Sequence, residues 1–123
     1  MASRLLLCTD LDRTLLPNGT QPESPGGRGL FARLARRAEV TLAYVTGRHR
    51  ALVEKAIAIY QLPLPDFVIA DVGSTVYQVN AGHWSHWGDW EREISSDWSG
   101  RSAADLKALF SALQPLRLQE VSK

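Results

Sequence analysis

The order of apolar runs and amphipathic stretches in the first 80 residues constrains the fold more than any other feature of this sequence. Short apolar or β-branched runs at residues 4–9, 39–46 and 67–72 predict three buried strands. Between them, residues 30–38 and 49–62 carry apolar side chains at helical spacing and predict two amphipathic helices. Strand, helix, strand, helix, strand at this spacing predicts an α/β fold, with a parallel sheet whose strands are joined by helical crossovers.

Each predicted helix has one apolar face that we expect to pack against the sheet. The face comprises Leu30, Leu34, Ala35 and Ala38 in the first helix, and Leu52, Val53, Ala56, Ile59 and Tyr60 in the second. Residues 17–29 are dense in proline and glycine and predict a loop. Cys8 falls within the first apolar run, where we expect a buried structural thiol.

The pattern changes near residue 80. Residues 76–79 and the turn at 80–82 predict a hairpin arm, and all four tryptophans follow, at positions 84, 87, 90 and 98. Residues 102–114 predict a helix capped by Ser102, and residues 116–123 begin like a strand. We therefore expect one half of a core domain in residues 1–79 and the beginning of a second subdomain in residues 80–123.

Composition excludes several classes of partner. The 123 residues suffice for one modest domain, and the net charge of +1 gives no electrostatic case for nucleic acid or an acidic membrane surface. No apolar stretch reaches the roughly 18 residues of a membrane span. The single cysteine excludes an internal disulfide and fits a reducing compartment, so we expect a cytoplasmic protein.

Polar side chains lie at the end of each of the three predicted strands. They are Asp10, Asp12 and Thr14 at the end of the first strand, Thr46 and Arg48 at the end of the second, and Asp71, Ser74 and Thr75 at the end of the third. Ligands bind outside the carboxyl ends of strands in open α/β sheets, so we expect these groups to converge. Two carboxylates so close repel unless a cation or a proton lies between them, and Mg²⁺ favours sites with few carboxylates plus phosphate oxygens. One carboxylate could then attack a phosphate while the other transfers protons.

Simpler interpretations exist for the same residues. The aspartate pair is compatible with a turn in which Asp caps local N–H groups, and Thr46 with a helix N-cap. Arg48 suits a phosphate or sugar contact as well as a solvated arginine in the first helical turn. The three histidines, His49, His83 and His86, lack the neighbours of a zinc site. The tryptophans could stack on a sugar, although packing is favoured.

Four segments together resemble one enzyme superfamily. The segment "DLDRTLL" at residues 10–16 resembles the DxDxT signature of the haloacid dehalogenase-like phosphatases, and "VTGR" at 45–48 resembles their second motif. "PDFVIADVGSTVY" and "HWSHWGDWER" resemble the sucrose-phosphate phosphatase branch, in which a large cap follows the third strand. The resemblance implies a Rossmann-like parallel sheet followed by the start of an α+β cap.

The resemblance also implies residue roles. Asp10 matches the nucleophile that forms an aspartyl-phosphate, and Asp12 matches the general acid/base. Thr14 matches the residue that supports the turn, while the Thr46 hydroxyl and the Gly47 N–H match the groups that hold the phosphoryl group. Mg²⁺, the implied cofactor, would contact the Asp10 side chain and the Asp12 backbone carbonyl.

Two further motifs of the superfamily, a lysine and an acidic pair, lie beyond residue 123 in its members. Half of an active site is therefore expected here, in a fragment of a longer phosphatase or in a truncated protein without full activity. The fragment is the favoured interpretation because the chain stops in the middle of a pattern, and we expect it to be inactive alone. Arg13 also departs from the superfamily, which more often has a small or amide residue there. The open sheet edge could drive self-association.

The function expected from this resemblance is Mg²⁺-dependent hydrolysis of a sugar phosphate, most like sucrose 6-phosphate. Two alternatives remain open. One is a phosphatase for another sugar phosphate, such as the mannosyl- or glucosyl-glycerate or glycerol phosphate types. The other is a non-catalytic module associated with sucrose-phosphate synthase and serving interaction or regulation, which the missing motifs would favour if the chain is complete.

Overall fold

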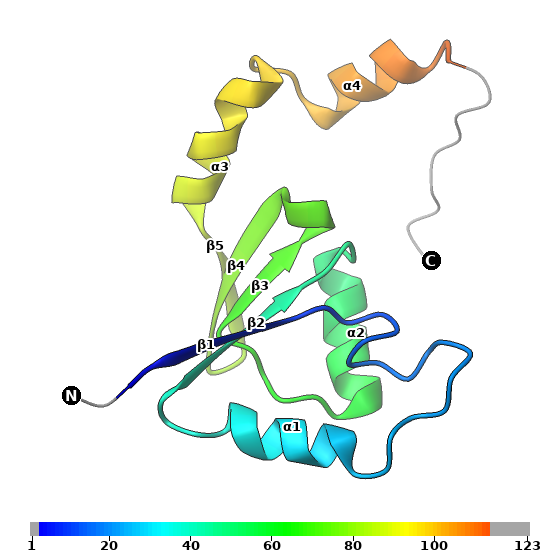
Figure 1. The fold of residues 1–123 in the computed structure, drawn as a ribbon. Helices are drawn as coiled ribbons and strands as arrows, with labels where there is room; N and C mark the ends of the chain where they lie inside the picture. Colours follow the sequence, from blue (N-terminus) through cyan, green and yellow to red (C-terminus); the bar gives the residue numbers. More distant parts are fainter. Residues whose placement is uncertain (1–2, 114–123) are drawn as a thin grey trace. The chain divides into compact units, whose positions relative to one another are not determined.

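A computed structural model describes residues 3–113 of the chain. Its sheet has five strands in the order β1-β2-β3-β4-β5 (Figure 1). The strands are β1 (Leu5–Thr9), β2 (Val40–Val45), β3 (Phe67–Ala70), β4 (Thr75–Asn80) and β5 (His83–His86). The helices are α1 (Gly27–Ala35), α2 (Arg50–Tyr60), α3 (Gly88–Ser95) and α4 (Ala103–Phe110), with short 3-10 turns η1 (Asp71–Gly73) and η2 (Ser96–Trp98).

The first three strands confirm the parallel sheet predicted from the sequence. β1 pairs with β2 in parallel from Leu5 opposite Val40 to Thr9 opposite Tyr44, and β2 pairs with β3 in parallel. β4 and β5 are antiparallel additions joined by a tight hairpin. In its turn Ala81 and Gly82 have positive φ angles of 49° and 81°, as a two-residue hairpin loop requires.

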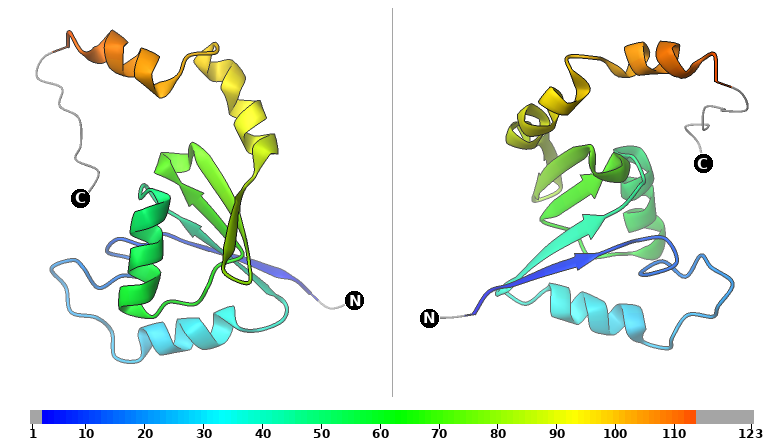
Figure 2. Two further views of the ribbon diagram at one scale, coloured as in Figure 1. Left: turned by 180° about the vertical axis from the view of Figure 1, so that it is seen from behind. Right: turned by 45° about the horizontal axis from the view of Figure 1, so that its top comes forward.

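One face of the sheet carries the core, because α1 and α2 both lie against it (Figure 2). Side chains alternate along each strand, so the inward positions of β2, β3 and β4 line up across the sheet. The fully or nearly buried side chains on this face include Leu42, Tyr44, Val68, Ala70, Tyr77 and Val79, with Val53 and Ala56 from α2. The carboxyl ends of β1, β2 and β3 lie at one edge of this layer.

Strand β1 exists where the sequence predicted it, but the prediction that it is buried was wrong. Leu5 and Leu6 are 47% and 62% exposed, and the Cys8 thiol is exposed rather than structural. β1 is an edge strand within the described sheet, and Leu6 and Cys8 alternate to the face opposite α1 and α2. The self-association expected through this edge stays a prediction.

Both crossover helices differ in detail from their predicted faces. Helix α1 begins at Gly27, inside the predicted loop, and ends at Ala35, so the predicted Ala38 lies beyond it and is exposed. Of the predicted face, Ala35 packs on the core as expected, together with Phe31, while Leu30 and Leu34 are 60% and 38% exposed. Both pairs have the i, i+4 spacing, so periodicity alone could not choose between them.

In α2 the predicted core residues Val53 and Ala56 are buried. Ile59, expected on the same face, is 62% exposed, and Ile57 packs against the core in its place.

The chain divides into two compact units, Met1–Glu91 and Arg92–Lys123. The first unit extends past residue 79, because β5 pairs with β4 in the same sheet. Assignment of residues 80–123 to a cap stays a prediction, and the strand expected at 116–123 lies outside the described residues.

In the second unit the predicted cap of α4 is confirmed. The Ser102 hydroxyl accepts a hydrogen bond from the Asp105 N–H at 3.2 Å, and the Asp105 carboxylate accepts one from the Ser102 N–H at 2.7 Å.

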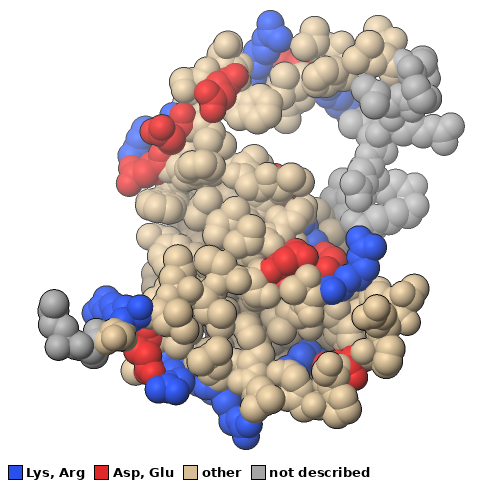
Figure 3. Space-filling model, in the orientation of Figure 1, with Lys and Arg blue, Asp and Glu red and all other residues tan. Residues whose placement is uncertain are grey.

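Surface charge shows no single-sign field on the face drawn in Figure 3, where acidic and basic side chains are interspersed among uncharged ones. None of the helices in the described part of the chain is long and apolar enough to cross a bilayer.

Candidate active site

In the loop after β1, two leucine side chains are buried in the core, and the carboxylates of Asp10 and Asp12 face outward. Leu11 and Leu16 are 0% and 1% exposed, and the Leu16 N–H donates to the Leu11 carbonyl at 2.8 Å. The Thr14 N–H donates to the same carbonyl at 3.2 Å, which closes a tight turn. Because Leu11 is anchored in the core, Asp10 and Asp12 on either side of it project from the end of the strand.

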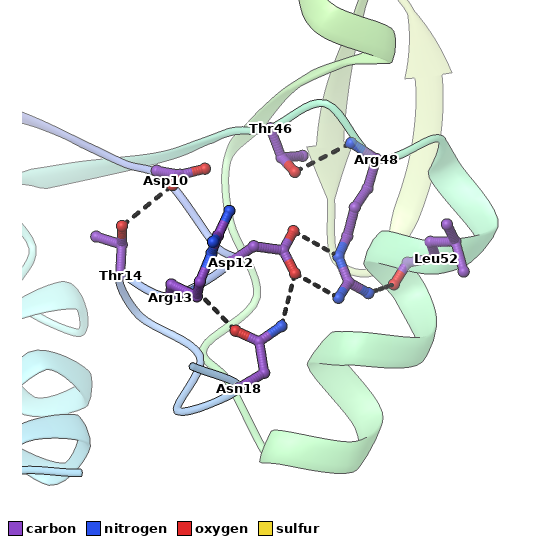
Figure 4. A network of polar contacts seen from close by, with 8 residues as sticks. All are labelled: Asp10, Asp12, Arg13, Thr14, Asn18, Thr46, Arg48 and Leu52. Atoms are coloured by element: carbon purple, nitrogen blue, oxygen red, sulfur yellow. Dashed lines mark hydrogen bonds and ion pairs between the residues drawn. The ribbon is translucent and has the colours of Figure 1, made fainter. Parts of the chain in front are cut away.

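Asp10 is exposed, and one of its carboxylate oxygens is fixed by its own loop. The Thr14 hydroxyl donates to Asp10 Oδ2 at 3.1 Å (Figure 4). The Thr9 hydroxyl donates to the Asp10 backbone carbonyl at 2.9 Å. Thr14 therefore supports the turn, as the resemblance implies, and it also orients the Asp10 carboxylate.

Asp12 is held by two side chains that sequence reasoning did not connect to it. Arg48 Nε and Nη2 donate to its two carboxylate oxygens at 2.8 and 2.7 Å, a bidentate ion pair. Asn18 Nδ2 donates to Oδ1 of the same carboxylate at 2.7 Å, and the Asn18 side-chain oxygen accepts from the Arg13 N–H at 2.7 Å (Figure 4). The Arg48 hydrogen bonds lower the pKa of Asp12 below its ordinary value of 3.8, against an opposing effect of burial.

Thr46 lies at the carboxyl end of β2, next to the loop that carries the aspartates. It is 5% exposed, and its N–H donates to the Ile69 carbonyl of β3 at 2.9 Å. Its hydroxyl oxygen accepts from the Arg48 N–H at 3.1 Å. Thr46 does not cap the helix, because α2 begins at Arg50 with His49 in the N-cap position.

Arg48 also lies at this end of the sheet, but its partner is Asp12 rather than a ligand or solvent. The sequence is compatible with Arg48 as a phosphate or sugar contact or as a solvated arginine. Its side chain is 24% exposed, pairs with Asp12 and also donates to the Leu52 carbonyl at 3.4 Å. The partner lies 36 residues away in sequence, so only the parallel pairing of β1 and β2 brings the two together.

The carboxyl end of β3 completes this edge of the sheet. The predicted end of this strand was wrong. Strand β3 stops at Ala70 rather than at Val72. Asp71, Val72 and Gly73 follow with φ angles of 51°, 57° and 89°, a run that cannot continue a strand. The Asp71 N–H donates to the Arg48 carbonyl at 3.0 Å and ties this turn to the segment after β2.

The oxygen donors present fit Mg²⁺ in part. The Asp10 carboxylate is an exposed hard ligand, whereas the Asp12 side chain is already paired with Arg48. Residues 3–113 contain no group of three or more His, Cys, Asp or Glu side chains arranged for a metal. Mg²⁺ is commonly bound through one or two carboxylates together with waters and phosphate oxygens, and its binding here stays a prediction.

Comparison with known proteins gives a consistent result. Residues 3–123 match the family model described as sucrose-6F-phosphate phosphohydrolase. A putative HAD-like hydrolase of Nitrosococcus oceani is 56% identical over 123 residues, which are 100% of this chain and 33% of that protein. A glucosylglycerol-phosphate synthase of Pseudomonas anguilliseptica is 43% identical over 72 residues, 58% of this chain and 9% of that protein. The chain thus spans a third or less of the length of these curated relatives.

Two solved structures share the fold. The sucrose-phosphatase from Synechocystis, determined in complex with sucrose and phosphate, superimposes with a TM-score of 0.73 at 23% identity, covering 99% of this chain and 46% of that one. A haloacid dehalogenase-like hydrolase protein from Bacillus subtilis superimposes with a TM-score of 0.61 at 17% identity, covering 90% and 49%. The Rossmann-like α/β architecture of the haloacid dehalogenase-like core is thereby confirmed.

Proposed function

Since the chain belongs to the sucrose-6F-phosphate phosphohydrolase family of haloacid dehalogenase-like hydrolases, we propose that it supplies the nucleophile and acid/base of a Mg²⁺-dependent sugar-phosphate phosphatase. One observation carries the proposal. The oriented carboxylate of Asp10 and the buried hydroxyl of Thr46 come from neighbouring strands at one sheet edge, with Asp12 two residues further on (Figure 4).

In the first step a carboxylate oxygen of Asp10 attacks the phosphorus, and the bond from phosphorus to the sugar oxygen breaks. The departing oxygen takes a proton from the Asp12 carboxyl group, a step that requires Arg48 to release the protonated form, because the ion pair with Arg48 favours the carboxylate. The oxygen of the Thr46 hydroxyl already accepts from the Arg48 N–H, so its own proton is directed elsewhere and can donate to a phosphoryl oxygen together with the Gly47 N–H.

In the second step a water molecule gives a proton to the Asp12 carboxylate, and the oxygen of that water attacks the phosphorus. The bond between phosphorus and Asp10 breaks, which releases inorganic phosphate and restores both carboxyl groups to their starting states. Arg48 and Asn18 hold the Asp12 carboxylate in a fixed orientation for this transfer, at 2.7–2.8 Å from its oxygens.

Mg²⁺ would be held by the Asp10 side chain and the Asp12 backbone carbonyl. When bound, it supplies positive charge that offsets the repulsion between the Asp10 carboxylate and the phosphate.

The substrate class follows from the family and is a sugar phosphate, with sucrose 6-phosphate as the leading member. A second candidate function has one observation in its favour. The related glucosylglycerol-phosphate synthase carries the matching segment in only 9% of its length, so a similar segment occurs within a synthase. A non-catalytic module serving interaction or regulation is therefore the alternative.

The test is phosphate release from sucrose 6-phosphate with Mg²⁺, comparing the protein with Asp10→Asn. The amide cannot act as the nucleophile, so any release by the unsubstituted protein should be lost in the variant. Removal of Mg²⁺ by a chelator should also abolish release. Equal release by both proteins would exclude the proposed role of Asp10, and a folded protein that binds sucrose 6-phosphate without releasing phosphate would point to a fragment of the phosphatase or to the module.

A further inference from the structure

The turn after β3 holds a β-branched residue in a conformation that its side chain disfavours. Asp71, Val72 and Gly73 have φ angles of 51°, 57° and 89° in succession. Glycine adopts this left-handed region without cost, and aspartate tolerates it, but for valine it is a true outlier. A glycine or asparagine at position 72 would give the same turn with less strain.

The surrounding contacts enforce this conformation from both sides. The Asp71 N–H donates to the Arg48 carbonyl at 3.0 Å, and the Ser74 N–H and hydroxyl both donate to the Asp71 carbonyl, at 3.2 and 2.9 Å. Trp90 Nε1 donates to the Gly73 carbonyl at 2.9 Å. Strain that is over-determined in this way points to a function for the strained residue.

The Val72 side chain contributes almost nothing to the core. It is 86% exposed, the highest value for a large apolar side chain among the described residues. Its Cγ2 atom lies 3.6 Å from the position that a Cβ on Gly47 would occupy. The isopropyl group therefore stands beside the backbone segment that is proposed to hold the phosphoryl group.

From these observations we infer that Val72 determines specificity by contacting an apolar face of the sugar of the bound sugar phosphate. The inference rests on the proposed function and deepens it. The C–H faces of a sugar ring are apolar, and binding sites combine such contacts with a few polar groups that fix the charged part of the ligand. Free phosphate has no such face, so Val72 should contribute to the affinity for a sugar phosphate and not to the affinity for inorganic phosphate.

The test measures binding of sucrose 6-phosphate and of inorganic phosphate by calorimetry with Mg²⁺ present, in the Asp10→Asn background so that turnover does not consume the sugar phosphate, together with the thermal midpoint. Val72→Gly removes the isopropyl group and the strain. We expect about tenfold weaker binding of sucrose 6-phosphate, the loss equivalent to one exposed valine contact. Binding of inorganic phosphate should stay within about twofold, while the midpoint rises by a few °C.

Ala81→Gly is the matched control. Ala81 is exposed and has a φ angle of 49°, and its hairpin lies at the opposite end of β4 from Val72. This variant should also raise the midpoint without changing either affinity. Val72→Thr keeps the shape and the strain but adds a polar atom, and it should weaken sucrose 6-phosphate binding about threefold with inorganic phosphate unchanged.

The outcomes separate this inference from the function on which it rests. Unchanged sucrose 6-phosphate binding in both Val72 variants would overturn the inference and leave the proposed function standing. Equal loss of both ligands would show that Val72 only maintains the turn, which also overturns it. A folded, unsubstituted protein that binds neither ligand would overturn the proposed function, and the inference with it.

Discussion

At the scale of single residues, the ion pair between Arg48 and Asp12 joins the loop after β1 to the segment after β2. The arginine uses two nitrogens on two oxygens, and Asn18 adds a third hydrogen bond at 2.7 Å. A bidentate pair fixes the plane of a carboxylate as well as its place. The orientation of the proposed acid/base thus depends on a residue from another strand.

This pair makes a specific contribution to stability that depends on pH. The folded-state pKa of Asp12 lies below 3.8, so the contribution is fully present above that pH and is lost as the pH falls through the folded pKa. The carboxylate is 37% exposed, so solvent screening limits the effect, and we expect Arg48→Met to lower the free energy of unfolding by about 1 kcal/mol at pH 7.

Urea unfolding of both proteins between pH 7 and pH 2.5 measures this effect. The difference between them should shrink below about pH 4, because protonated Asp12 no longer gains from the arginine. Arg36→Met, at the exposed end of α1, is the control and should change stability little at any pH. A difference that stays constant down to pH 2.5 would show that Arg48 stabilises the fold by packing alone.

Sequence reasoning found the residues of the site more readily than their partners. Asp10, Asp12 and Thr46 each follow an apolar run directly, and the end of a strand is a local property that composition reveals. Asn18 lies in a loop rich in proline and glycine, where nothing local predicts its hydrogen bond to Asp12. Partners of that kind depend on how loops fold back in space.

At the scale of elements, helix α2 shows that the sheet determines which of a helix's apolar residues are buried. Periodicity correctly predicted the helix and the burial of Val53, which is 0% exposed, but it also placed Ile59 inward. The strands set the contact surface, and Ile57 fits it instead. The same holds for α1, where the pairs Leu30/Leu34 and Phe31/Ala35 have the same spacing and only the second packs on the core.

Substitution of alanine for one buried and one exposed residue of α2 checks this assignment. Val53→Ala should lower the free energy of unfolding by about 2 kcal/mol, because it removes buried methyl groups and leaves a cavity. Ile59→Ala is the matched change on the exposed side, where Ile59 is 62% exposed, and should cost less than about 0.5 kcal/mol. Chemical unfolding measures both, and equal losses would mean that α2 is rotated relative to its position here.

At the scale of the whole molecule, burial is distributed unevenly along the chain. All buried residues in the described part lie between Leu11 and Trp84, whereas α3 and α4 contain none. The order of strands and helices in the first unit followed from the sequence, because each element there has an apolar face that the others bury. The aromatic and helical pattern after residue 80 carried no comparable information about what its apolar residues contact.

This distribution predicts how the molecule opens. Local unfolding is cheapest where few apolar contacts hold the backbone, so amides of α4 should exchange with solvent far faster than those of β2 and β3. Hydrogen exchange read by mass spectrometry measures the difference. Ser102→Ala removes the capping box and should speed exchange in α4 further, by roughly fivefold for a cap of about 1 kcal/mol, without altering β2. Protection of α4 equal to that of β2 would show that the second unit has a stable packing partner of its own.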